Sequence, residues 1–447
     1  MNFSSKIKTI FRSLKYRNYR LFFFGQSISL IGTWMQRIAL PWLVYQLTDS
    51  VFLLGVVGFA GQIPAFLLSP VAGVITDRFN RYNVLLVTQI ASFFQALILS
   101  ILAMTGVIKV WHILLLSIIH GCINAFDSPS RHAFVIEMVE KKEDLGNAIA
   151  LNSLMVNGAR LIGPSVAGII LAVTDASICF LINAISYLFV VFSLFMMHLE
   201  KKQTIIKRTN IRKEMKEGLA YTFGFKPIRS LILLLALVNL MGASYQVLMP
   251  VYAKDILHGG SDFFGFLMSS AGLGALISAL YLASRESVLK LGNIIPVSAA
   301  LFGVSLIILS VVKTFYLSVI IMVFVGAGLM CHSAGTNTIL QTITNDDMRG
   351  RVMSYYTMAI MGTLPFGNLL TAALAKLLGT PAAIFIGGLS SLVGALLFLK
   401  KLPELRKIVR PVYIKMGIIP EVASGLQAAS EPANETTDLT YPQSGKI

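Results

Sequence analysis

Charged residues are scarce in this sequence. Asp, Glu, Lys and Arg make up 13% of its 447 residues, whereas a typical soluble domain carries about 25%. Hydrophobic residues make up 55%. This balance excludes an ordinary soluble protein of the same length and predicts a chain that crosses a membrane many times.

Cysteine is also scarce. The three cysteines, Cys122, Cys179 and Cys331, all lie in apolar runs and lack the spacing of a disulfide framework or a metal site. The sequence contains no G-x-x-x-x-G-K-[ST] loop for nucleotide phosphates, and no nucleophile–base constellation stands out. We therefore expect no catalytic residues, no bound metal and no cofactor, so the protein is not predicted to be an enzyme.

Positive charge is abundant but unevenly placed. The net charge is +16, and Lys and Arg cluster in alternate connecting segments such as 6–20, 78–81 and 131–142, while 48–50 and 105–109 are nearly bare. This alternation follows the positive-inside rule of membrane proteins and argues against nucleic-acid binding. Both termini and the long middle segment are predicted to be cytoplasmic.

Apolar runs of roughly 20 residues, each long enough to cross a bilayer as a helix, recur along the chain. Their predicted limits are 21–45, 51–75, 83–105, 111–128, 147–173, 177–197, 229–252, 263–284, 293–312, 315–340, 352–377 and 381–400. The predicted fold class is an all-α polytopic membrane protein with about twelve transmembrane helices in two six-helix halves.

The halves are predicted to occupy residues 21–197 and 229–400. The segment 198–228 between them is basic and partly amphipathic, and is expected to lie as a linker on the inner face of the membrane. Residues 1–20 and 401–447 are predicted to form the cytoplasmic ends, and the polar end of the latter to be disordered.

Polar residues recur at helical spacing within predicted spans 1, 4, 7 and 10. Such groups are costly in hydrocarbon unless they face a cavity or a partner. We therefore predict a central, water-accessible substrate cavity, the alternative being hydrogen bonds that hold the helices together. The residues are Gln26, Ser29, Thr33 and Arg37; Ser117, His120, Asn124 and Asp127; Asn239, Gly242 and Gln246; and Ser333, Asn337 and Gln341.

Two arginines lie deep in the predicted spans. Arg37 falls in span 1, and Arg160 falls near the middle of span 5, one turn after Asn157. A membrane-centred Arg costs at least about 2.5–3.5 kcal/mol. An acidic partner, a hydrated cavity or an anionic substrate can offset this cost, and the structural alternative is pairing with backbone carbonyls or snorkelling to the interface.

Two residues of span 4 are able to titrate. Asp127 is either a proton carrier, because a desolvated carboxylate titrates nearer neutral pH, or the salt-bridge partner of Arg78 or Arg81 at a gate, which we favour. His120 has either a proton-coupling role or an ordinary hydrogen bond.

A short charged segment, Gly73-Val-Ile-Thr-Asp77-Arg78-Phe-Asn-Arg81, separates the second and third spans. Its Asp77 is expected to lie against the N-terminus of span 11, near residues 350–352, where a carboxylate gains roughly 0.3–1 kcal/mol. The alternative is a plain basic turn without a gating role.

This G-x-x-x-D-R-x-x-R segment resembles the cytoplasmic gate motif of the major facilitator superfamily. Residues 22–29, 32–42, 125–131 and 157–164 are similar to the drug–proton antiporter-3 group of that superfamily, which includes enterobactin and macrolide exporters. The resemblance implies twelve helices, alternating access, and export from the cytoplasm across a bacterial inner (plasma) membrane, driven by proton entry.

Two positions depart from the pattern. Asn80 stands where the gate motif usually has Gly, and because Asn tolerates the left-handed conformation, the turn is expected to survive this difference. Ser117 and His120 occupy the region of span 4 where many proton antiporters carry an Arg, which leaves the proton route open.

The sequence thus predicts a monomeric secondary transporter that exports a small amphipathic molecule, either a siderophore or a drug-like compound. Its partners would be this molecule, protons and the lipid bilayer, without nucleic acid. Arg37 and Arg160 favour an anionic cargo. The alternatives are a transporter of other cargo or direction, such as a lysophospholipid flippase or a nutrient importer, and a non-transporting membrane receptor or scaffold.

Overall fold

The computed structural model describes residues 11–197, 211–285, 288–289 and 291–416, without the side chains of 69–71, 73–78, 142, 211–215 and 415. The first half contains η1 (Arg12–Lys15), α2 (Arg17–Thr48), α3 (Val51–Arg78), α4 (Arg81–Met104), α5 (Val110–Glu137), α6 (Lys142–Val173) and α7 (Ala176–Phe195). The second half follows α8 (Ile211–Gly224) and contains α9 (Lys226–Leu237), η2 (Val238–Gly242), η3 (Ala243–Leu248), α10 (Met249–Val251), η4 (Tyr252–Ile256), α11 (Ser261–Ala283), α12 (Leu291–Val311), α13 (Phe315–Ile343), α14 (Asp346–Thr357), η5 (Met358–Gly362), α15 (Thr363–Leu378) and α16 (Thr380–Lys415).

The predicted helical membrane fold is confirmed. Within the described residues, eleven helical segments are long and apolar enough to cross a membrane. The remaining long helix, α2, has 32 residues and packs between α6 and α7. Its polar residues make it less apolar than these eleven segments. With α2, the bundle reaches the predicted twelve spans.

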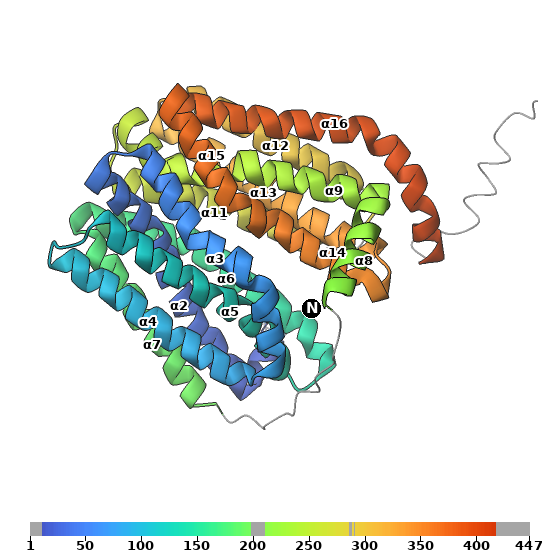
Figure 1. Cartoon of the computed structure of the whole chain (residues 1–447), viewed down its shortest axis with the longest axis horizontal. Helices are drawn as coiled ribbons and strands as arrows, with labels where there is room; N and C mark the ends of the chain where they lie inside the picture. The colour runs from blue at the N-terminus through green and yellow to red at the C-terminus, as the bar shows by residue number, and fades with distance from the viewer. Residues whose placement is uncertain (1–10, 198–210, 286–287, 290, 417–447) are drawn as a thin grey trace, which may run out of the picture.

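The two halves lie side by side, and each contributes helices to the boundary between them (Figure 1). Across this boundary α3 packs against α15, and α6 packs against α11. The deep polar residues of α6 therefore lie near the interface of the halves, and α2 packs against α6 beside them.

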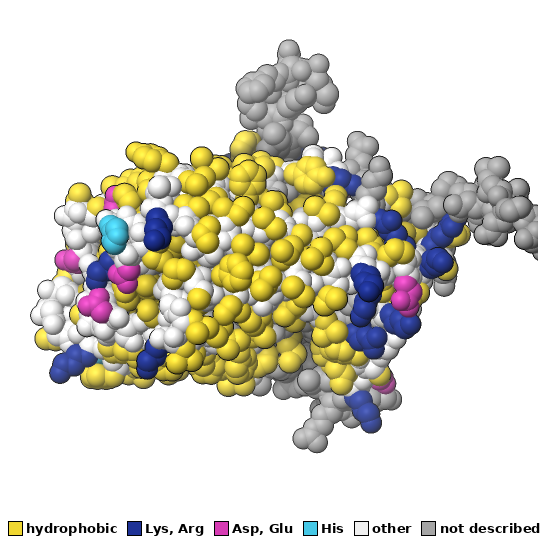
Figure 2. Space-filling view, turned by 90° about the horizontal axis from the view of Figure 1, so that it is seen from above, with side chains coloured by type: hydrophobic (Ala, Val, Ile, Leu, Met, Phe, Trp, Pro, Cys, Tyr) yellow, Lys and Arg dark blue, Asp and Glu magenta, His cyan; other side chains and the backbone are white. Residues whose placement is uncertain are grey.

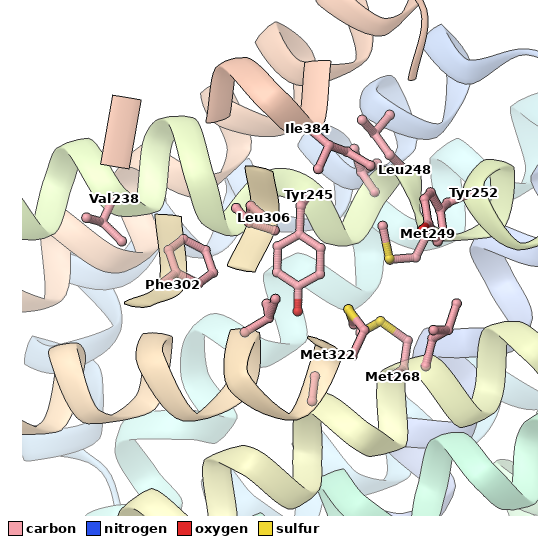
Figure 3. Close-up of a cluster of buried hydrophobic side chains, with 14 of the residues drawn as sticks. Val238, Tyr245, Leu248, Met249, Tyr252, Met268, Phe302, Leu306, Met322 and Ile384 are labelled. Atoms are coloured by element: carbon pink, nitrogen blue, oxygen red, sulfur yellow. The ribbon is translucent and has the colours of Figure 1, made fainter. Parts of the chain in front are cut away.

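The first span of the second half is irregular. It changes from α9 to the π-helical turn η2, the 3₁₀ segment η3, one turn of α10 and a second π-helical turn, η4. Its side chains form much of an apolar cluster in which the Tyr245 and Phe302 rings lie 6.2 Å apart (Figure 3). The Tyr252 hydroxyl reaches the carbonyl oxygens of Leu309 and Val312 at 3.0 and 2.8 Å. Tertiary packing thus supports the irregular winding.

Several predicted limits were too short. Helix α3 continues to Arg78, so the turn that joins it to α4 consists of Phe79 and Asn80. Helix α5 continues to Glu137, and α16 runs through the predicted boundary at 400 to Lys415. In the predicted linker, α8 begins at Ile211, whereas 198–210 and the end of the tail, 417–447, lie outside the described residues.

Asn80 joins α3 to α4 without adopting the left-handed conformation. Its backbone is extended, with φ −63° and ψ 118°, and it caps the N-terminus of α4 by accepting a hydrogen bond from the backbone N–H of Tyr82 at 2.9 Å. Asn is among the residues preferred at this position, because its side chain satisfies an otherwise unpaired backbone donor.

The surface has a broad hydrophobic band (Figure 2). Lys and Arg gather at one end of the band, which we call the basic end. The opposite end, which we call the short-loop end, carries Asp, Glu and His among a few basic residues. This is the distribution expected of a membrane protein whose helix ends face different compartments.

Candidate functional site

Two arginines that the sequence placed deep in the membrane contact the ring of Trp34 on α2. The guanidinium carbon of Arg37 lies 4.8 Å from the centre of the Trp34 rings, and that of Arg160 lies 5.1 Å from it. The two guanidinium groups are therefore within about 10 Å of each other. This arrangement joins α2 and α6 in one cationic, aromatic site.

Local geometry explains how the two helices meet here. Arg37 follows Trp34 by three residues on α2, so both lie on one face of the helix. Gly163 follows Arg160 on α6, and a Cβ atom at Gly163 would lie only 2.5 Å from the Cβ of Trp34. The absence of a side chain at Gly163 therefore lets α6 approach α2 at the indole.

Neither arginine has an acidic partner within the described part of the chain: no carboxylate forms an ion pair with Arg37 or Arg160, and no hydrogen bond satisfies either guanidinium. Arg37 is exposed although it lies far inside α2, and Arg160 is half-buried. The arrangement leaves two fixed positive charges accessible, which suits recognition of an anion.

Further polar groups surround the pair. His120 of α5 lies within electrostatic range of Arg37 and of Asp127. Tyr245, from the second half, lies within electrostatic range of Arg160. The structure thus brings together residues of α2, α5, α6 and η3, and the charged members all come from the first half.

Several predicted cavity residues carry buried polar atoms without a hydrogen-bond partner among the described residues. These atoms are Gln26 Oε1, Ser29 Oγ, Ser117 Oγ and His120 Nδ1. They lie on α2 and α5, along the two predicted polar faces. Because buried polar atoms are nearly always satisfied by protein or water, their clustering is consistent with a hydrated interior.

Other predicted cavity residues form hydrogen bonds within the protein. Thr33 donates to the Ser29 carbonyl at 2.9 Å and Asn157 to the Ser153 carbonyl at 2.9 Å. Asn239 donates to the Leu235 carbonyl at 2.9 Å, and Asn337 accepts from Gln341. These contacts agree with the structural alternative for these residues.

The remaining cavity candidates are accessible to different degrees. Asn124 and Ser333 are half-buried, and Gln246 is exposed. The Ser333 carbonyl accepts a hydrogen bond from the Tyr356 hydroxyl at 3.2 Å, which joins α13 to α14. The assignment of these three residues to the substrate cavity stays a prediction.

Asp127 has partners other than those expected. It accepts hydrogen bonds from Thr88 at 3.0 Å and Gln89 at 2.7 Å, and its other oxygen lies 3.7 Å from Arg131 Nε, one turn further along α5. Among the described contacts Asp127 does not pair with Arg81, which pairs with Glu137. The alternative pairing with Arg78 stays a prediction, because that side chain lies outside the described residues. Asp127 thus ties α5 to α4 within the first half.

Arg81 pairs instead with Glu137, Nη1 to Oε1 at 2.7 Å, and both side chains are half-buried. Of the other predicted gate residues, Gly73, Asp77 and Arg78 belong to the last two turns of α3. Their side chains lie outside the described part of the structure, so the gating role remains a prediction.

Three residues of the site were not predicted. Trp34 could have been found from its spacing to Arg37, since residues three apart share a helix face. Glu137 was missed because α5 was predicted to end near 128. Tyr245 could not be found from sequence, because its distance from Arg160 depends on how the two halves dock.

Comparisons with known proteins agree with this architecture. Residues 8–416 match the model of a family described as transmembrane secretion effector. The chain is 30% identical over 382 residues to the staphyloferrin A transporter of Staphylococcus aureus, covering 84% of this chain and 94% of that protein. It is 22% identical over 382 residues to macrolide efflux protein A of Streptococcus pyogenes, with the same coverage.

The fold is also that of solved transporters. A crystal structure of a POT family transporter in complex with a thioalcohol-conjugated peptide superposes with a TM-score of 0.68 at 14% identity, covering 87% of this chain and 96% of that one. At this identity the likeness shows a shared fold.

Proposed function

Because the chain belongs to the transmembrane secretion effector family of the major facilitator superfamily, we propose that this membrane transporter exports a small amphipathic anion. The observation that carries the proposal is the pair Arg37 and Arg160 around Trp34, without an acidic partner among the described residues. Membership of a transporter family also means that the chain is not an enzyme.

The energetics of the pair support an anionic cargo. Each deep Arg costs at least about 2.5–3.5 kcal/mol, and a cation–π contact offsets only about 0.5–2 kcal/mol of that. An anion that binds between the guanidiniums supplies charge-assisted hydrogen bonds to both. The Trp34 ring offers an apolar surface for the rest of an amphipathic molecule.

A siderophore is the cargo class that we favour. The identity to the staphyloferrin A transporter is 30%, compared with 22% for the macrolide efflux protein. The two arginines point the same way, because they favour an acidic molecule.

We propose that export proceeds by alternating access in the inner membrane of a bacterium, as a monomer with both termini cytoplasmic. The basic end in Figure 2 would face the cytoplasm. Protons are the proposed coupling ion, because the sequence has no nucleotide-binding loop. His120 is the proposed site of coupling, since its Nδ1 lacks a partner among the described residues and Arg37 is near.

The first experiment compares small molecules in medium and cell extract by untargeted mass spectrometry, with and without iron. The strains are a deletion strain and strains that produce wild type, Arg37→Gln, Arg160→Gln or Arg229→Gln. Arg229 is an exposed residue of α9 and controls for loss of one positive charge. Since a hydrogen bond to a charged group contributes about 1.5–3 kcal/mol, each deep variant should export at least about tenfold less cargo.

A compound retained in cells and missing from the medium in the deletion and both deep variants, but exported normally by Arg229→Gln, supports the proposal. Iron dependence identifies the cargo as a siderophore. Uptake of the compound along an inward proton gradient contradicts export and favours an importer. An unchanged compound profile in every strain contradicts export of an endogenous anion.

The gate is tested separately with Asp77→Asn. A carboxylate at a helix N-terminus contributes roughly 0.3–1 kcal/mol, and up to about 2 when partly buried, enough to bias one conformation over another. We expect this variant to lose export while it accumulates normally in the membrane. Full transport by Asp77→Asn contradicts the gating role and leaves the cargo proposal intact.

A further inference from the structure

A groove runs along the outer face of the first half, between α2 and α7. Its two connected segments have volumes of about 220 and 280 Å³ and share Ile28 and Phe189. One segment reaches Met35, near the middle of α2, and Ile182 of α7. The other reaches Arg20 near the basic end.

Small residues form the floor of the groove. A Cβ atom at Gly25 would lie 2.4 Å from Ser193 Oγ, and one at Gly32 would lie 2.5 Å from Ser186 Oγ, so the two helices touch there. Large apolar side chains form the walls and remain exposed, including Phe24 at 57% and Phe192 at 63%. This is an apolar channel open to the side, facing where lipid tails lie.

The groove is longer than the hydrocarbon depth of one leaflet. Arg20 and Met35 are fifteen residues apart on α2, about 22 Å at 1.5 Å per residue. Half of a hydrocarbon core about 30 Å thick is about 15 Å. A lipid tail that starts near Arg20 therefore remains in the groove over the depth of its leaflet.

The charge at the groove determines which lipid fits. Arg20 is exposed, and within the described residues its guanidinium forms no ion pair or hydrogen bond. It lies at the end of the groove near the N-terminal basic cluster, and Arg17 lies one turn earlier on α2. Basic residues beside a cleft between helices are typical of sites for anionic lipid head groups.

We propose that the α2–α7 groove binds one anionic phospholipid of the leaflet at the basic end, with its phosphate at Arg20 and an acyl chain along Phe24, Ile28 and Ile185. The site lies on the lipid-facing side, away from the pair of arginines around Trp34. It depends on the membrane location of the chain and is independent of the proposed cargo and direction of transport.

The test uses the full-length protein, purified and equilibrated in mixed micelles with equal amounts of phosphatidylglycerol and phosphatidylethanolamine. Native mass spectrometry then measures which lipid stays bound. The variants are Arg20→Gln, Arg20→Lys and Ile185→Trp, which fills the groove from an exposed position. Lys400→Gln and Val304→Trp change exposed residues of α16 and α12 and serve as matched controls.

Wild type should retain one phosphatidylglycerol in preference to phosphatidylethanolamine. Since one basic residue near a membrane surface contributes about 1 kcal/mol, Arg20→Gln should lower this preference roughly fivefold. Arg20→Lys should keep it, because it keeps the charge. Ile185→Trp should reduce retention of both lipids, while both controls behave as wild type.

Three results overturn the proposal. The wild type shows no lipid preference, Arg20→Gln leaves the preference unchanged, or Lys400→Gln lowers the preference as much as Arg20→Gln does. A dimer that Ile185→Trp dissociates would show that a second copy of the chain occupies the groove, and also overturns it. Normal export together with loss of lipid selectivity in Arg20→Gln would separate this site from the cargo site.

Discussion

At the short-loop end, Tyr45 of α2 and Asp49, which follows α2, connect the first half to η4 of the second half. Lys254 Nζ lies 2.7 Å from Asp49 Oδ1, and the Tyr45 hydroxyl donates to Asp255. At the basic end, each ion pair that the structure describes joins residues of a single half. Arg81 pairs with Glu137 in the first half, and Arg351 pairs with Glu217 beside the second.

Packing shows the same difference. Near the short-loop end, Gly168 of α6 and Gly265 of α11 bring their backbones into contact, and the Ser165 and Ser269 hydroxyls lie 2.6 Å apart. Trp42 stacks on Phe264 with their ring centres 6.1 Å apart. The two halves are therefore held together most closely at this end.

The basic end is instead braced within the first half. Asp144, at the start of α6, is buried and accepts a hydrogen bond from Tyr16 at 2.7 Å. It also pairs with Arg12 and with Lys15, and the hydrogen bond to its carboxylate raises the pKa of Lys15. These contacts fix the segment before α2 to α6 without linking the two halves.

The difference between the two ends indicates which contacts change when the halves move. Contacts within a half preserve it as a unit, whereas contacts between halves must break if the units rock against each other. Under the proposed mechanism, the structure represents the state that is closed at the short-loop end. Export would then require the contacts of Asp49, Lys254, Ser165 and Ser269 to separate once in every cycle.

The largest effect is expected from locking the closed end. Ser165→Cys with Ser269→Cys, in a chain whose Cys122, Cys179 and Cys331 are replaced by Ala, places two sulfurs where hydroxyl oxygens are 2.6 Å apart. Oxidation should form a disulfide between α6 and α11 and abolish export. Reduction should restore it, as measured by transport into vesicles.

Each single cysteine variant controls for the substitutions themselves. Normal transport by the oxidised double variant, with the disulfide verified by mass spectrometry, would show that α6 and α11 need not separate here.

A smaller effect is expected from disturbing the contact between the glycines. In Gly168→Ala, the new Cβ would lie 2.9 Å from Gly265 Cα, an overpacking that typically costs about 1–3 kcal/mol. Gly158, on the same helix, has no neighbouring atom within 4 Å. Gly158→Ala should therefore stabilise slightly, by about 0.5–1 kcal/mol. Thermal unfolding in detergent measures both, and equal shifts would contradict the close approach.

The smallest effect is expected from the exposed ion pairs. Asp49→Asn removes a pair between the halves whose side chains are 41% and 71% exposed. Exposed pairs contribute at most about 1 kcal/mol, so the balance between closed and open states should shift by no more than about fivefold. Glu404→Gln removes a comparably exposed pair with Lys226 inside the second half and should leave the balance unchanged.

Labelling of a single cysteine at Gln246 from the short-loop side measures this shift. If Glu404→Gln increases labelling as much as Asp49→Asn does, the pair between the halves has no special role in holding the short-loop end closed.

The sequence predicted those parts of the structure that depend only on residues close together in the chain. Apolar runs and short polar breaks located the spans, since each run alone is long enough to cross a bilayer. The turns η2 and η4 were not predicted, because no local signal in their sequences distinguishes a π-helical turn from regular α-helix. Their winding depends on packing, with Gly242 against Phe302 and Ser391.

The site was predicted less completely than the fold. Arg37 and Arg160 were identified because deep charges in a membrane are rare and costly. Both arginines contact Trp34 because of the register in which α2 packs on α6. The sequence of a single span does not determine that register. Likewise, the pairing of Arg81 with Glu137 rather than Asp127 depends on how α4 and α5 pack.

The polar face of α2 has a consequence for biogenesis. Helix α2 is less apolar than the spans that follow it, and an Arg near the helix centre opposes insertion by the translocon. Only Asp49 and Ser50 separate α2 from the strongly apolar α3. We therefore expect the two helices to enter the bilayer together as a hairpin, so that the helix that carries Arg37 depends on its successor for membrane insertion.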